Sequence, residues 1–134
     1  MIAPLVRLAD WRPRLDQYLR DLRGQPFVWG RLDCALFCAG AVEAMTGVDL
    51  ARGWRGYRTE TAGLRKLSQA GFASHVEYLA SLLPEVHPSQ VVIGDIVVLS
   101  DVTLALVQGH LAIAVGPDGI GPAPMNTATR AFSV

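Results

Sequence analysis

The stretch GQPFVWGRLDCALFCAGAVEAMTG, residues 24–47, carries a helical pattern with both ends marked. Asp33 is a favourable N-cap residue, and Gly47 is a typical residue for ending a helix. Between them, apolar side chains recur at helical spacing and form a single stripe. The stripe consists of Cys34, Phe37, Cys38, Ala41, Val42 and Met45. The pattern predicts a helix from residue 34 to about 46 that packs flat against a core.

Three further helices are expected around this one. The first begins after Asp10, which we expect to be its N-cap, and ends at Gly24. Another spans about 60–70, and a fourth opens with the capping box that starts at Ser74 and runs to about residue 83. The intervening segment 48–58 is expected to be a surface loop.

After residue 90 the pattern changes to short apolar runs separated by glycine and proline, which is typical of β-strands. The runs are 91–93, 96–99, 104–107 and 110–116, with short edge strands at 120–123 and 131–134. Helices followed by strands predict an α+β fold, with the N-terminal helices packed on a small antiparallel sheet. The length of 134 residues predicts one domain, 1–134, without a linker.

The composition gives no reason to expect a nucleic-acid or membrane partner, because twelve basic residues balance twelve acidic ones. The basic residues crowd the first quarter of the chain, where they form either a face for an acidic partner or, as we favour, an ordinary solvated helix face. They are Arg12, Arg14, Arg20, Arg23 and Arg31.

The start of the sequence lacks a basic segment followed by an apolar run, so no secretory signal is expected. The apolar runs are also too short to cross a bilayer. We therefore expect synthesis in the cytoplasm, and release by lysis or within a particle if the protein acts outside the cell.

The two cysteines, Cys34 and Cys38, lie four residues apart on the predicted helix, a spacing with poor disulfide geometry. No histidine or second cysteine pair has the spacing of a zinc site. We expect free thiols, no metal and no organic cofactor.

Cys34 is the candidate nucleophile because it lies in the first helical turn, where backbone N–H groups and the helix dipole lower a thiol pKa. Three histidines are candidate bases. His75 is expected to be exposed on a helix and His87 lies in a loop, whereas His110 opens an apolar strand. Cysteine followed far downstream by histidine is the order of papain-like enzymes. The alternative is that Cys34 is a core residue and His110 is structural or exposed.

The sequence also resembles the NlpC/P60 cell-wall peptidases in three blocks that occur in the family's order. Residues 24–34 resemble the stretch Gly-x-Pro-Tyr-x-Trp-Gly before Asp-Cys-Ser. Residues 94–98 resemble Gly-Asp-Leu-Val-Phe, and residues 109–116 resemble His-Val-Gly-Ile-Tyr-x-Gly. The resemblance is closest to compact members encoded among phage and prophage tail genes.

This resemblance implies a papain-like fold and a cysteine hydrolase that cuts an amide bond in peptidoglycan stem peptides by acyl transfer. Cys34 would attack, His110 would carry the proton and Asn126 would be the nearest group able to orient the histidine. The expected substrate-binding residues are Phe27, Trp29, Asp33, Trp54 and Tyr57.

The sequence departs from the family at Phe27, where a tyrosine is usual, and at Ala35, where a serine is usual. The strand after Gly116 also offers no ionisable residue to orient His110. These departures favour a second hypothesis, a weakly active or inactive structural or assembly component of a phage tail tip, present in the virion or needed only for assembly. Its partners would be other tail-tip proteins. A third hypothesis is a module that binds peptide or glycan in the same cleft without chemistry.

Overall fold

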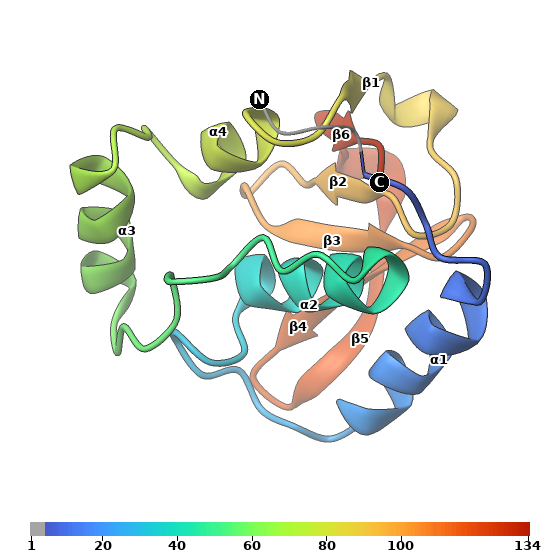
Figure 1. Cartoon of the computed structure of the whole chain (residues 1–134), viewed down its shortest axis with the longest axis horizontal. Coiled ribbons are helices and arrows are strands. Elements are labelled where there is room, and N and C mark those ends of the chain that lie inside the picture. Colours follow the sequence, from blue (N-terminus) through green and yellow to red (C-terminus); the bar gives the residue numbers. More distant parts are fainter. Residues whose placement is uncertain (1–4) are drawn as a thin grey trace.

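The computed structural model describes residues 5–134, and the order of its elements is helices first and strands after (Figure 1). Residues 1–4 lie outside the described residues. They belong to the predicted domain 1–134 and to the N-terminal segment in which no secretory signal is expected. The helices of the described part are α1 (Trp11–Asp21), α2 (Cys34–Thr46), α3 (Glu60–Gln69) and α4 (His75–Ala80). The strands are β1 (Glu85–Val86), β2 (Ile96–Val98), β3 (Leu104–Val107), β4 (Leu111–Gly116), β5 (Gly119–Pro124) and β6 (Arg130–Phe132).

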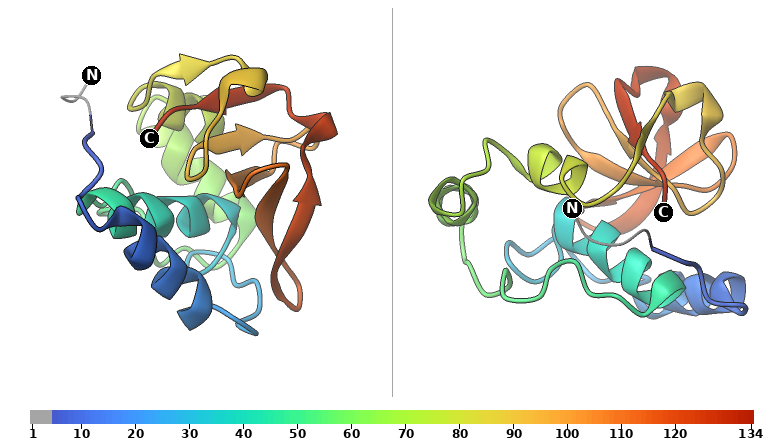
Figure 2. Two further views of the ribbon diagram at one scale, coloured as in Figure 1. Left: turned by 90° about the vertical axis from the view of Figure 1, so that its right-hand side faces the viewer. Right: turned by 45° about the horizontal axis from the view of Figure 1, so that its top comes forward.

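The strands form one antiparallel sheet in the order β1-β6-β2-β3-β4-β5. Helices α1 and α2 lie together on one side of this sheet (Figure 2). The predicted α+β fold, with N-terminal helices packed on an antiparallel sheet, is therefore confirmed. None of the helices in residues 5–134 combines the length and apolar character needed to cross a bilayer.

Helix α2 is the centre of the core, between α1 and strands β3 and β4. Its predicted N-cap and C-terminal glycine are confirmed, since the Asp33 side chain accepts from the Leu36 N–H and Gly47 has a φ of 79°. Helix α1 is joined to α2 by the Tyr18 hydroxyl, which donates a hydrogen bond to the Phe37 carbonyl over 2.7 Å. Gly40 permits this close approach, because a Cβ at that position would clash with the Tyr18 ring.

Strands β2 and β3 are buried on both faces. Ile96, Val98 and Leu106 belong to the main core under the helices, whereas Val97 and Val107 belong to a smaller cluster on the opposite face. This alternation follows from the two-residue period of a strand. The central strands are thereby fixed in register, because a shift by one residue would exchange the two faces.

The structure corrects several local predictions. Asp10 does not cap α1, because its carboxylate binds Arg14 at 2.9 Å and makes no side-chain bond to the backbone. Helix α4 has the predicted Ser74 cap but ends at Ala80, several residues early, since Pro84 disfavours helical geometry just before it. The apolar run 91–93 is not a strand, and the two-residue strand β1 was not predicted.

Asp95 is a buried carboxylate, 2% exposed, that joins the two ends of the described chain. Its Oδ1 accepts from the Arg7 guanidinium at 3.1 Å and from the Val134 N–H at 3.0 Å. Its Oδ2 accepts from the Val92 N–H at 3.0 Å. One side chain therefore satisfies groups from three separate segments.

We predict that Asp95→Ala lowers the free energy of unfolding by about 2–4 kcal/mol, because it leaves the largely buried Arg7 guanidinium without its counter-charge and two N–H groups without their acceptor. Urea denaturation measures the change. The control is Asp16→Ala, which breaks the exposed Arg12–Asp16 pair and is expected to cost under about 1 kcal/mol. Equal losses in the two variants would contradict the role assigned to Asp95.

Candidate functional site

The segment before α2 is shaped by a tight turn in which the Val28 N–H donates to the Leu32 carbonyl over 2.9 Å. Gly30 lies in this turn with a φ of 74°, a conformation that favours glycine. A Cβ on Gly30 would also collide with the backbone of Tyr57. The glycine therefore allows the loop that carries Tyr57 to pass directly over the turn.

Asp33 holds this arrangement together. Its Oδ1 accepts from the Leu36 N–H at 2.9 Å, and its Oδ2 accepts from the Gly30 N–H at 3.1 Å and from the Tyr57 hydroxyl. Burial and the bond to Asp33 raise the pKa of Tyr57. Because Asp33 is only 1% exposed and both of its oxygens are occupied, it orders the wall of the site and is not available as the predicted substrate contact.

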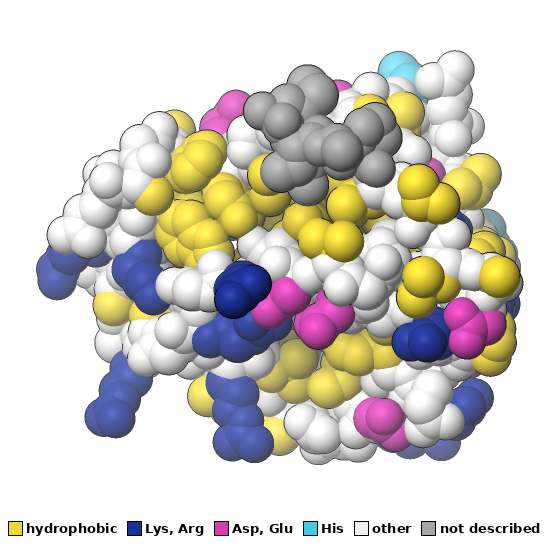
Figure 3. Space-filling view, in the orientation of Figure 1, with side chains coloured by type: hydrophobic (Ala, Val, Ile, Leu, Met, Phe, Trp, Pro, Cys, Tyr) yellow, Lys and Arg dark blue, Asp and Glu magenta, His cyan; other side chains and the backbone are white. Residues whose placement is uncertain are grey.

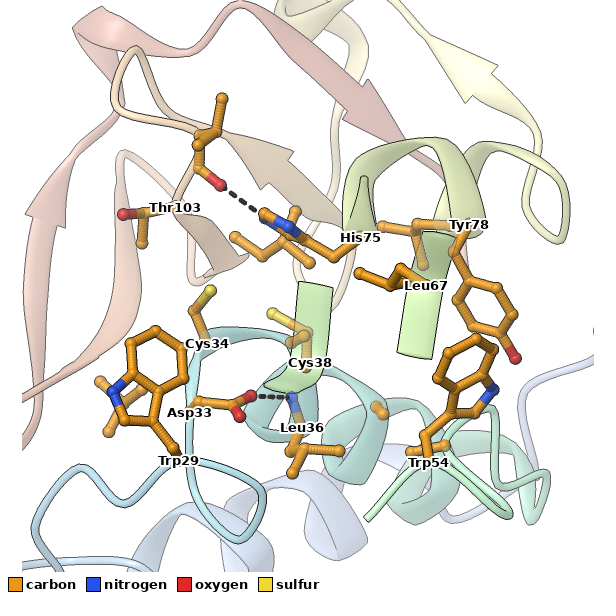
Figure 4. A pocket seen from close by; sticks show the side chains of 18 of the residues that line it. Trp29, Asp33, Cys34, Leu36, Cys38, Trp54, Leu67, His75, Tyr78 and Thr103 are labelled. Carbon is orange, nitrogen blue, oxygen red and sulfur yellow. Dashed lines mark hydrogen bonds between the residues drawn. The ribbon is translucent and has the colours of Figure 1, made fainter. Parts of the chain in front are cut away.

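A cavity of about 290 Å³ opens at the N-terminus of α2, and we call it the cleft (Figure 4). Its walls come from α2, α3, α4 and the loop between β2 and β3. Cys34 and all five predicted substrate-binding residues line it. These five are Phe27, Trp29, Asp33, Trp54 and Tyr57, from segments that are not adjacent in sequence.

The aromatic side chains of the cleft are braced by edge-to-face contacts. Phe27 and Trp29 have ring centroids 4.7 Å apart, and Trp54 lies 4.8 Å from Tyr78. Figure 3 shows hydrophobic side chains gathered on the face beside α3 and α4. Trp29, Leu64 and Val102 form an apolar rim that is 38%, 47% and 57% exposed. Trp54 is half-buried in its aromatic cluster, so it serves at least as a packing anchor.

Cys34 lies at the start of α2 and faces the cleft (Figure 4). Burial raises the pKa of its thiol, and the Asp33 and Asp101 carboxylates act in the same direction. The backbone N–H groups of Leu104 and Ala35 lower the pKa but do not offset the burial. The lowered pKa expected from the helix N-terminus is therefore wrong, because desolvation of the thiolate is the larger effect.

His75 is the histidine that shares the cleft with Cys34. It was expected to be exposed on α4. The residue is half-buried, and its Nε2 lies 2.8 Å from the Val102 carbonyl. A carbonyl only accepts, so Nε2 carries the proton in this contact and a neutral ring has its free lone pair on Nδ1.

The predicted pairing of Cys34 with His110 is wrong in this structure. The backbone N–H of Leu104, the first residue of β3, donates a hydrogen bond to the thiol. His110 follows the other end of β3, in the turn that the Gln108 N–H closes on the Leu111 carbonyl. At the usual rise of a strand, β3 alone separates these ends by about 10 Å. The histidine motif was assigned to β4, whereas the strand beside Cys34 is β3, which contains no histidine.

Asn126 also lies away from Cys34. Leu111 pairs with Pro124 across β4 and β5, so Asn126, which follows directly, lies at the same end of the sheet as His110. Both side chains are exposed. The structure thus brings the expected binding residues to Cys34 and leaves His110 and Asn126 at the opposite end of the sheet.

Sequence reasoning missed several residues of the cleft, among them Leu64, Asp101, Thr103, Leu104 and Tyr78. The capping box at Ser74 does place His75 at a helix start, but no spacing rule connects that start to Cys34. Within residues 5–134, no three His, Cys, Asp or Glu side chains gather in a way that could hold a metal ion.

We predict that Cys34 reacts slowly with iodoacetamide at neutral pH, more slowly than the same thiol in urea-unfolded protein. The raised pKa leaves less thiolate in the folded state, so the rate should keep rising with pH after the unfolded thiol has levelled off. Mass spectrometry locates the adduct, and Cys38 should stay unmodified because it is 1% exposed. A fast reaction below neutral pH, slowed in His110→Ala, would contradict this account.

The chain matches one family model over residues 6–134, and it belongs to that family, the domain of unknown function DUF6950. A search of curated proteins finds no match.

Proposed function

We propose that this member of the DUF6950 family is a recognition protein that holds an apolar segment of a partner protein in the cleft without cutting it. The observation that carries the proposal is the setting of Cys34. Its thiol lies in a largely apolar cavity, its pKa is raised, and the adjacent strand β3 contains no residue that could act as a base.

The shape and chemistry of the cleft support binding of side chains. Its volume of about 290 Å³ suits one or two apolar side chains, at the small end of ligand pockets. The exposed rim of Trp29, Leu64 and Val102 offers apolar surface that a bound partner would bury. Helix α3, which forms one wall, has no buried residue of its own. A partner segment would therefore cover surface that the protein itself leaves open.

The resemblance to compact NlpC/P60-like proteins of phage tails supports a tail-tip protein as the partner. In this proposal a papain-like scaffold is retained for contacts in tail assembly, with the protein made in the host cytoplasm and carried in the virion.

We predict that a random heptapeptide library, selected on the immobilised protein, yields sequences with a shared apolar residue. Leu64→Glu places a charge on the rim and should weaken binding of the selected peptides about tenfold or more, because the carboxylate must be desolvated. Val92→Glu is the matched control, since Val92 is also exposed, at 59%, but does not line the cleft. Retained binding in Leu64→Glu, or no selected sequence, would refute the proposal.

A second candidate is the cysteine hydrolase of peptidoglycan stem peptides, and the presence of His75 in the cleft favours it. Here Nδ1 of His75 takes the thiol proton, Cys34 Sγ attacks the amide carbon, and the proton passes to the leaving amine. Water then hydrolyses the thioester and regenerates the thiol.

Chromatography of stem tetrapeptides incubated with the protein separates the two candidates. The recognition proposal predicts no cleavage, and binding of the selected peptides unchanged in Cys34→Ser. Cleavage that is lost in Cys34→Ser and His75→Ala, but kept in His110→Ala, would establish the hydrolase instead.

A further inference from the structure

A second hollow lies between the C-terminal half of α1 and the β4–β5 end of the sheet. It is open, has a volume of about 440 Å³, and shares no lining residue with the cleft. We call it the basic hollow. Its lining includes Leu19, Arg20, Arg23, His110, Ile113 and Ile120.

All titratable residues of this lining are basic: Arg20, Arg23 and His110. The lining contains no carboxylate, although the whole protein has a formal net charge of zero. The excess of positive charge is therefore local, and an anion entering the hollow meets no acidic lining residue.

The arginines of α1 and of the turn that follows it divide into two pairs with different surroundings. Arg12 and Arg14 are neutralised on the helix by Asp16 and Asp10, at 3.5 and 2.9 Å. Within the described residues Arg20 and Arg23 make no ion pair. Arg20 donates a hydrogen bond from Nη2 to Oε1 of Gln17 at 2.8 Å. Its other guanidinium N–H groups are left for a ligand. The pair beside the hollow is thus the pair without a counter-charge.

The rest of the hollow is apolar. Leu19 of α1 and Ile113 and Ile120 of the sheet contribute half-buried aliphatic side chains. The neighbouring edge strand β5 contains Pro122, which has no N–H, so the edge is poorly suited to pairing with an added strand. Recognition here would depend on side chains. The guanidinium groups would bind an anionic group of the ligand, and the aliphatic side chains would contact the apolar part of the same ligand.

We propose that the basic hollow binds a carboxylate carried on an aliphatic chain. The planar guanidinium groups of Arg20 and Arg23 suit the two oxygens of a carboxylate. The aliphatic chain would lie over Leu19, Ile113 and Ile120. Two sources share this chemistry, the C-terminal residue of a peptide and a free aliphatic acid. The site is independent of the cleft and of the function proposed for it.

NMR titration of the full chain tests the proposal with two probes, N-acetyl-leucine for a peptide C-terminus and isocaproate for a free acid. We expect one or both to shift the signals of His110 and Ile113 and to leave Trp54, in the cleft, unchanged. Tighter binding of N-acetyl-leucine would identify the peptide source, and tighter binding of isocaproate the free acid. N-acetyl-leucinamide lacks the charge and acetate lacks the chain, so both should bind more weakly.

The variants separate specific binding from a general effect of charge. Arg20→Gln with Arg23→Gln should weaken binding about tenfold, from the loss of two exposed charged contacts. Arg12→Gln with Arg14→Gln removes the same charge from α1 outside the lining of the hollow, and it should change affinity less than twofold. Equal effects of the two double variants would overturn the proposal, as would equal binding of acetate or N-acetyl-leucinamide, or no shift with either acid.

Discussion

The site depends on one buried carboxylate, that of Asp33. It caps α2 through the Leu36 N–H, fixes the preceding turn through the Gly30 N–H, and receives the Tyr57 hydroxyl from a distant loop. A buried carboxylate is tolerated only when its oxygens are hydrogen-bonded, so these three contacts support one another. Cys34 follows directly in the chain, and its position at the floor of the cleft is a consequence of this cap.

The antiparallel register of the sheet decides which chemistry can reach that cysteine. Since β3 begins beside Cys34 and ends at the turn before His110, the two candidate catalytic residues are held at opposite ends of one strand. What remains at the thiol is an apolar wall, the backbone of β3, and His75 from α4. These surroundings of the thiol are the basis of the proposal that the cleft holds a side chain and does not activate a nucleophile.

Burial explains why motif and chemistry separate here. A helix N-terminus favours a thiolate, but enclosure by apolar side chains disfavours it more, and the pKa of Cys34 is raised. The same apolar lining favours binding of an apolar group, because binding removes apolar surface from water. Arg20 of α1, Arg23 just after it and the exposed His110 instead line a separate hollow, which shares no residue with the cleft.

Elements whose signals are local could be predicted from the amino-acid sequence. The apolar stripe, Asp33 and Gly47 define α2, the Ser74 capping box starts α4, and the change to short apolar runs predicts the sheet. The motif before Cys34 and the aromatic residues Trp54 and Tyr57 also identified much of the cleft. Which histidine shares the cleft with Cys34 depends on long-range packing. The packing of α4 brings His75 to the cleft, and the pairing of β3 with β4 keeps His110 at the other end of the sheet. Nothing local in the sequence records that pairing, because it depends on contacts between residues far apart in the chain.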